Sequence, residues 1–185
     1  ILKNKICIAP MCQYSANNGN PTNWHYAHLE KLMNAGAGLM MIESTAVSKQ
    51  GMITNQDLSL KSNENVKKLT RLIKYIRQVS NTKIGIQLSH SGRKGSAMVP
   101  WIKSNSPLRI GKQGWQTIAP SPIRRDKHWP EPKEANKNDI KIIVNNFALA
   151  AERAKKIGFD CLEIHMAHGY LLHQFFSPIS NKRND

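Results

Sequence analysis

Short apolar runs and longer amphipathic segments alternate along this 185-residue chain. The short runs have the continuous apolar character of strands that are buried on both faces. They predict four strands, at residues 5–9, 39–43, 83–88 and 161–164. Each run stops at polar residues, so the pattern also predicts where each strand ends.

Between the strands, apolar residues recur at spacings of three and four, which is the pattern of an amphipathic helix. Three long helices and one short helix are expected, at about 24–35, at 63–79 with Asn63 as its cap, from Asn138 or Asp139 to just before Gly158, and from Tyr170 to Pro178.

The resulting βαβαβαβ order predicts a parallel sheet in an α/β fold. A doubly wound sheet usually carries a Gly-x-Gly-x-x-Gly turn after its first strand, but here residues 10–14 read Pro-Met-Cys-Gln-Tyr. We therefore predict a (β/α)8 TIM barrel, of which residues 1–185 cover roughly the first four βα units as one partial domain. A long loop excursion is expected at about 89–134, either as a lid or as an ordered surface hairpin.

Polar groups follow all four predicted strands. Because a barrel collects the C-terminal ends of its strands at one face, these groups are expected to converge there. They are Cys12 and Tyr14 after the first strand, residues 43–45 after the second, Gln87 and His90 after the third, and residues 165–170 after the fourth.

The chain is strongly basic, with 27 Lys and Arg against 12 Asp and Glu and a net charge of +15. Such a balance is typical of proteins that bind nucleic acid, so a basic α/β nucleic-acid-binding module is one alternative function. The basic residues stand singly or in pairs, without an RNA-binding aromatic signature or a recognition-helix pattern. We therefore predict a small-molecule substrate and no nucleic-acid partner.

Cys7, Cys12 and Cys161 are odd in number and far apart, which favours a reducing, cytoplasmic compartment over a disulfide scaffold. No apolar run reaches the roughly 18 residues that a membrane span needs, so no membrane partner is expected. The chain begins without Met and shows no signal peptide. We expect a piece of a longer protein, for which a homo-oligomer is one possible full-length form.

His165 and His168 permit two interpretations. As zinc ligands they would indicate a metal-dependent barrel hydrolase, but such a site needs at least a third protein ligand, and none stands at a suitable spacing. As hydrogen-bond donors, two imidazoles at one strand end can stabilise negative charge on a ligand oxygen. Tyr170 follows closely and can act as a general acid. We predict the donor role and no metal.

Blocks of residues spread over almost the whole chain form one ordered set. They are residues 9–15 (APMCQYS), 42–47 (IESTAV), 50–51, 85–94 (GIQLSHSGRK), 114–121, 158–160, 165–171 (HMAHGYL), 177–178 and 180–183. Together they resemble the N-terminal half of the Old Yellow Enzyme family. The best fit is the bacterial subclass of ene-reductases and xenobiotic reductases that carry a cysteine near the flavin.

This resemblance implies an FMN cofactor, with NAD(P)H as co-substrate. Six residues would then bind the cofactor: Ala9, Pro10 and Met11 through their backbone, Cys12 against the flavin ring, Ser44 near a ring carbonyl, and Gln87 at the pyrimidine edge. Gln87 also fits this role on its own, because a buried amide needs both a donor and an acceptor partner. Residues 90–94 would line the rim of the active site.

The resemblance also implies the reaction, which is reduction of activated alkenes (enones), nitro compounds or other xenobiotics. Tyr14, His165 and His168 would bind the substrate, and Tyr170 would donate the proton. In the family, later strands contribute an arginine on the flavin and the glycine-rich phosphate site. Since the chain stops inside a family motif, we expect it to bind FMN poorly by itself.

Overall fold

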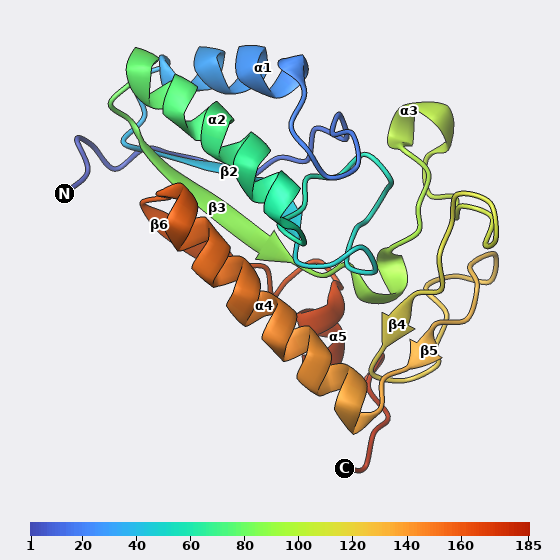
Figure 1. Ribbon diagram of the computed structural model, residues 1–185. Helices are drawn as coiled ribbons and strands as arrows, with labels where there is room; N and C mark the ends of the chain where they lie inside the picture. The colour runs from blue at the N-terminus through green and yellow to red at the C-terminus, as the bar shows by residue number, and fades with distance from the viewer.

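A four-stranded parallel sheet forms the centre of the fold, which we describe from a computed structural model covering all residues, 1–185 (Figure 1). The strands lie in the order β1 (Cys7–Ile8), β2 (Leu39–Ala46), β3 (Lys83–Ser89) and β6 (Cys161–Ile164). All three strand pairs are parallel. The first strand is shorter than the predicted 5–9, because only Cys7 and Ile8 find ladder partners on β2.

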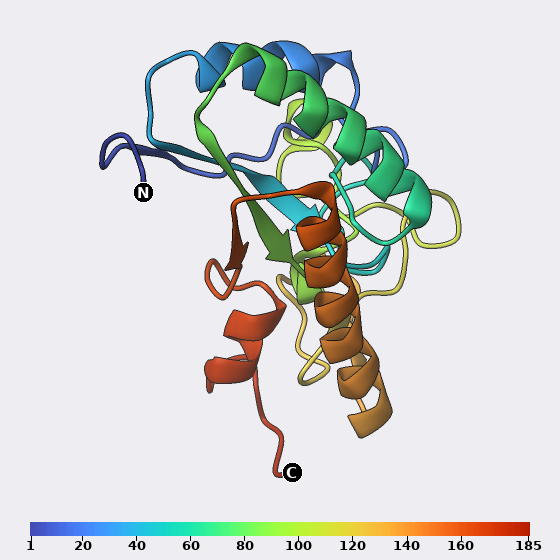
Figure 2. The ribbon, with the colours of Figure 1, turned by 60° about the vertical axis from the view of Figure 1, so that its left-hand side comes forward.

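Three long helices connect these strands: α1 (Asn23–Met33), α2 (Asn63–Val79) and α4 (Lys137–Ile157). They contribute to one apolar core of 18 buried residues together with β2 and β3, so they pack on the same face of the sheet. The turned view in Figure 2 shows α1 and α2 side by side and α4 alongside β3 and β6. A doubly wound sheet has helices on both faces. The one-sided arrangement is that of a (β/α)8 barrel wall.

Local sequence signals set the helix boundaries. Ser62, and not Asn63, caps α2, because its side chain accepts from the backbone N–H of Asn65. Helix α4 begins one or two residues before the predicted start, because Asn136 and Asp139 form a reciprocal capping box. Gly158 ends α4 in the left-handed region, with φ of 95°.

The long excursion between β3 and α4 contains several short elements. They are a 3-10 turn η1 (Gly92–Lys94), a short helix α3 (Pro100–Lys103) and strand β4 (Ile118–Ala119). Strand β4 pairs with β5 (Lys133–Glu134) in parallel, so these two strands do not form a hairpin with each other. After β6, a loop leads into the short helix α5 (Leu171–Phe176).

None of these helices is both long enough and apolar enough to cross a membrane.

Candidate active site

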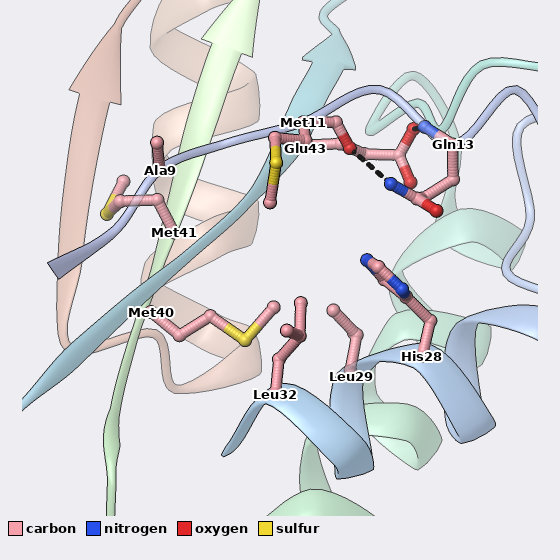
Figure 3. Close-up of a pocket in the computed structure, with 9 residues that line it drawn as sticks. All are labelled: Ala9, Met11, Gln13, His28, Leu29, Leu32, Met40, Met41 and Glu43. Carbon is pink, nitrogen blue, oxygen red and sulfur yellow. Dashed lines mark hydrogen bonds between the residues drawn. The ribbon is translucent and has the colours of Figure 1, made fainter. Parts of the chain in front are cut away.

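The segment after β1 is held in place by a buried carboxylate on β2. Glu43 is 5% exposed and its Oε2 accepts from the backbone N–H of Gln13 at 3.0 Å. Its Oε1 lies 3.2 Å from Nε2 of the buried His25 on α1. The Gln13 side chain folds back and donates to the carbonyl of Met11 at 2.8 Å (Figure 3). These contacts fix the path of the chain through Cys12 and Tyr14.

Cys12 and Tyr14 reach an apolar cluster formed by Ile53, Ala97 and Trp129. Burial, reinforced by the charges of Asp57 and Glu43, raises the pKa of the Cys12 thiol to about 12. The thiol is therefore protonated at neutral pH. Tyr14 has a φ of 46°, in the left-handed region that few non-glycine residues adopt. Strained backbone of this kind concentrates at functional sites.

Ser44, Gln87 and Glu163 lie side by side on β2, β3 and β6. The strand register pairs Ser44 with Gln87 and Gln87 with Glu163, after a bulge between Ile42 and Ser44. Gln87 is buried, and its Nε2 donates to Glu163 Oε1 at 2.6 Å. This bond uses one of the two amide N–H donors and leaves the amide oxygen as an acceptor.

His165 and His168 meet at the C-terminal end of β6. Nδ1 of His165 accepts from the N–H of Ala167 at 3.2 Å, so the neutral ring carries its hydrogen on Nε2. That Nε2 lies 3.3 Å from Nδ1 of His168, whose backbone φ is 55°. Burial and the neighbouring His168 lower the pKa of His165, which keeps its imidazole neutral at pH 7. Nε2 of His165 is therefore an uncharged N–H donor.

Tyr170 packs against this pair, with its ring centroid 4.6 Å from that of His165. Burial, followed by the effects of Cys12 and Asp57, raises its pKa above the ordinary tyrosine value. Its hydroxyl is thus a proton donor throughout the neutral range. Tyr170 and Tyr14 both line a cavity of about 270 Å³.

Gln174, which the sequence did not single out, and Lys94, which it placed only within the rim segment 90–94, position this end of the site. Gln174 on α5 is buried and bonds across the loops, donating to Ser91 O and to Gly169 O at 3.2 and 2.7 Å. Lys94 donates to the carbonyl of His168 at 2.7 Å. No local spacing pattern predicts these hydrogen bonds, because Lys94 bonds to His168 and Gln174 bonds to Ser91, in each case more than 70 residues away in the sequence.

The sequence-based placement of residues 90–94 along the rim is correct only in part. Lys94 lines the cavity, but His90 is 1% exposed and Ser91 is fully buried. Nδ1 of His90 accepts from the N–H of Gly92 at 3.1 Å. His90 is therefore a structural residue beneath the turn.

The structure thus brings most of the expected residues to one end of the sheet, in two neighbouring groups. Tyr14 and Tyr170 line the cavity, and Cys12 packs with them against the same apolar cluster. His165 and His168 lie behind Tyr170, which His165 contacts directly. Ser44 and Gln87 lie on adjoining strand ends. Ala9 and Met11 instead line a small separate pocket towards α1, which Figure 3 shows together with Leu29 and Met40.

Comparison with known proteins connects this geometry to a family. The model of the NADH:flavin oxidoreductase / NADH oxidase family matches residues 1–185. The sequence is 46% identical over 185 residues to an NADH:flavin oxidoreductase of Gibberella zeae, covering 98% of this chain and 45% of that protein. It is 44% identical over 186 residues to an NADPH dehydrogenase of Listeria innocua, covering 100% of this chain and 50% of the relative.

A solved structure of morphinone reductase superposes with a TM-score of 0.83 at 22% identity, covering 100% of this chain and 50% of that one. At this identity the match speaks for the fold, a (β/α)8 barrel in which the four strands described here are the first half. The chain spans about half the length of the curated relatives it matches.

Proposed function

Because the chain belongs to the NADH:flavin oxidoreductase / NADH oxidase family, we propose that its protein uses FMN and NAD(P)H to reduce activated alkenes or nitro compounds. The observation that carries this proposal is the contact between the His165–His168 imidazole pair and the protonated phenol of Tyr170, which lines one cavity. FMN and a nicotinamide co-substrate are the redox partners of the family.

The residues at the strand ends fit the flavin ring. The free amide oxygen of buried Gln87 can accept from an N–H on the pyrimidine edge, and Ser44 stands beside it on β2. Cys12 supplies a neutral thiol, and Ala9, Pro10 and Met11 supply backbone next to it. We propose these six residues as the flavin contacts. The chemistry that FMN supplies when bound is hydride transfer between NAD(P)H and the acceptor.

The roles of the protein side chains follow from their protonation states. His165 and His168 hold the carbonyl or nitro oxygen, where negative charge develops as hydride adds to the conjugated carbon. Because Nε2 of His165 faces Nδ1 of His168 in the structure, the exposed ring of His168 would have to turn aside for both imidazoles to donate to this oxygen. Tyr170 then donates its hydroxyl proton to the other alkene carbon. Tyr14 closes the pocket opposite Tyr170.

The two alternative functions have less support. A hydrolase would need a third ligand beside His165 and His168, and no group of three or more His, Cys, Asp or Glu side chains stands close enough to hold a metal. The chain belongs to a family of flavin enzymes, so its positive charge gives no separate support for nucleic-acid binding.

We propose a cytoplasmic location, supported by three free thiols, and propose a homo-oligomer as the form of the full-length protein.

Reduction of FMN by NADPH, followed by reoxidation with 2-cyclohexenone, tests the proposal in stopped flow. The purified protein is supplied with FMN at a concentration that saturates even a weak site. We expect bleaching of the flavin band with NADPH and its recovery with the enone. In protein whose absorbance spectrum shows bound FMN, NADPH oxidation that does not depend on the flavin, or no flavin reduction at all, would contradict the proposal.

The His165→Ala and His168→Ala variants test the donor role in the same assay. Each should slow reduction of the enone by about 10²-fold or less, because one preorganised donor remains in each variant. Binding of FMN, followed by its absorbance shift, should be unchanged. Stoichiometric zinc in the wild type that is lost in both variants would instead support the hydrolase alternative.

A further inference from the structure

The cavity between Tyr14 and Tyr170 carries two cationic side chains to which the proposed reaction gives no role. Among the residues that line it, Lys94 and Arg125 are the charged ones, and the others are apolar, hydroxyl, phenol or amide groups. No carboxylate lines the cavity. The volume of about 270 Å³ admits a small aromatic or conjugated acid.

Lys94 is anchored at the inner side of this cavity. Its Nζ donates one hydrogen bond, to the carbonyl of His168 at 2.7 Å, and lies 5.3 Å from the ring centroid of Tyr170. An ammonium group has three N–H donors, so two remain for a ligand. The charge therefore sits next to the proposed proton donor.

Arg125 faces the same cavity from the long excursion. Its guanidinium stacks 4.4 Å above the ring of Trp129, which is 2% exposed. Stacking on a buried ring fixes the plane of the guanidinium and leaves its N–H edge for a planar anion. The aromatic platform thus holds Arg125 in an orientation suited to a carboxylate.

The neighbouring Arg93 brings these two cations together. Its Nη1 donates to the carbonyl oxygens of Ile123 and Arg124 at 3.1 and 3.3 Å. These two hydrogen bonds connect η1, which contains Lys94, to residues 123–124, which directly precede Arg125. Side chains more than 30 residues apart in sequence are in this way fixed around one cavity.

Neither charge takes part in an ion pair within the protein, although the adjacent Asp126 attracts the guanidinium of Arg125. The seven ion pairs of the structure include neither Lys94 nor Arg125. Burial lowers the pKa of both groups, and for Lys94 the nearby Arg125 and Arg93 lower it further. Placing an anion between them would relieve this repulsion, whereas a neutral ligand would not.

We propose that Lys94 and Arg125 form a subsite for an anionic group, so that the acceptor reduced here is an activated alkene or nitro compound that bears a carboxylate. Assigning the carboxylate to the acceptor rests on the function proposed above. The anion-binding chemistry itself does not, and a phosphate of the nicotinamide co-substrate is the other source of the same chemistry.

Titration calorimetry with the purified chain, without FMN, tests the subsite independently of the redox reaction. The probes are 4-hydroxybenzoate and 4-hydroxybenzamide, which share the ring and the phenol but differ in charge. We expect the acid to bind about 10-fold or more tightly than the amide, the scale of charge-assisted hydrogen bonds. Raising the salt concentration should weaken binding of the acid alone.

Variants of adjacent arginines provide a matched control. Arg125→Leu should remove the preference for the acid, whereas Arg124→Leu should keep it, because Arg124 is exposed and faces Glu131 at 3.7 Å. Lys94→Gln serves as a second variant, and circular dichroism verifies that each protein is folded. Equal affinity of the wild type for acid and amide would overturn the proposal, as would equal losses in the two arginine variants.

Titration of the same proteins with NADPH separates the two sources. If Arg125→Leu weakens 4-hydroxybenzoate and leaves NADPH unchanged, the carboxylate belongs to the acceptor. If it weakens NADPH alone, the anionic subsite serves the co-substrate and the acceptor assignment is wrong. Charge-selective binding in a protein that fails to reduce FMN would retain the subsite and remove the proposed function.

Discussion

At the scale of single residues, burial sets the protonation states that the proposed reaction requires. It raises the pKa of Tyr170 and Cys12 and lowers that of His165, so all three side chains are uncharged at neutral pH. A neutral imidazole and a protonated phenol can both donate hydrogen bonds to a ligand. In the proposed reaction, the oxygen-binding imidazole of His165 and the proton-donating phenol of Tyr170 are therefore both neutral donors.

Replacing Tyr170 with phenylalanine tests its role as the acid. In the FMN-loaded protein, Tyr170→Phe should slow enone reduction by about 10²–10⁴-fold, the usual effect of losing a general acid. Flavin reduction by NADPH should stay near the wild-type rate, because that step needs no proton from this residue. Stopped-flow absorbance resolves the two half-reactions.

A quinone provides the control acceptor for this variant, because its reduction needs no protonation at carbon. We expect Tyr170→Phe to reduce the quinone at close to the wild-type rate. If enone and quinone are both reduced at wild-type rates, Tyr170 is not the acid, and its hydroxyl has only a structural role.

His90 predicts how stability depends on pH. Complete burial lowers its pKa from 6.5 to about 4, so between these values the unfolded chain binds a proton that the folded protein does not. Stability conferred by neutral His90 is thus present above pH 6.5 and is lost as the pH falls towards 4. The free energy of unfolding should fall over this window by up to about 3 kcal/mol through this residue.

Urea unfolding of wild type and His90→Asn between pH 7.5 and 4.5 measures this contribution. Asparagine keeps an acceptor for the N–H of Gly92 but has no proton to gain. The variant should therefore show the shallower pH dependence. Parallel curves for the two proteins would show that another group carries the acid sensitivity.

At the scale of elements, buried side chains from distant segments tie the active-site loops to the sheet. Glu43 holds the loop after β1, Gln174 holds the loops after β3 and β6, and Arg93 holds the excursion. These ties leave the loops ordered although they carry little regular structure. The helices, in contrast, are bounded by local signals such as Ser62, Asn136 and Gly158.

Gly158 gives a test of such a boundary. Its φ of 95° is in the left-handed region, where a Cβ is unfavourable, although no other atom lies near the added Cβ. Gly158→Ala should lower the free energy of unfolding by about 1 kcal/mol through this conformational cost. Thermal or urea unfolding measures the change.

Gly158→Asn is the matched control, because asparagine tolerates the left-handed region better than alanine does. We expect it to recover part of the stability that Gly158→Ala loses. An alanine variant as stable as wild type would show that α4 ends in another conformation.

At the scale of the whole molecule, the sheet is open at β1 and β6, and apolar side chains are exposed near the second edge. Leu162 and Ile164 on β6 are 39% and 48% exposed, and Ile142 and Val144 on α4 are 50% and 63% exposed. An exposed edge strand with apolar neighbours favours association with another chain. The net charge of +15 opposes such association at low salt.

We therefore expect the purified chain to self-associate as the salt concentration rises, and a lysine on β6 to reduce this. Leu162→Lys and Ile164→Lys should each lower the associated fraction in sedimentation velocity. Val79→Lys, which makes the same substitution at an exposed apolar residue of α2, controls for the change in net charge. Association of the β6 variants that matches wild type at every salt concentration would locate the contact elsewhere.

The amino-acid sequence by itself determined the number and order of the main elements. The apolar periods gave α2 and β6 with the bounds found in the structure, because in both the pattern and the flanking polar residues agree. The strand-end positions of Gln87 and His165 also followed from the pattern, since polar side chains that close an apolar run lie at its end. The expectation that all four strands are buried on both faces is wrong for β1 and β6, which are mostly exposed because they form the edges of the sheet. The family resemblance could be recognised from the sequence because each of its blocks is a run of consecutive residues.

Only the tertiary structure decided which distant groups meet. The helices share one face of the sheet, so the barrel wall is chosen by packing and not by any single helix pattern. The buried state of His90 and the cross-chain contacts of Glu43, Gln174 and Lys94 depend on segments far apart in the chain. The position of Lys94 and Arg125 on one cavity also depends on the tertiary structure, because the cavity forms only when the segments that line it have folded together.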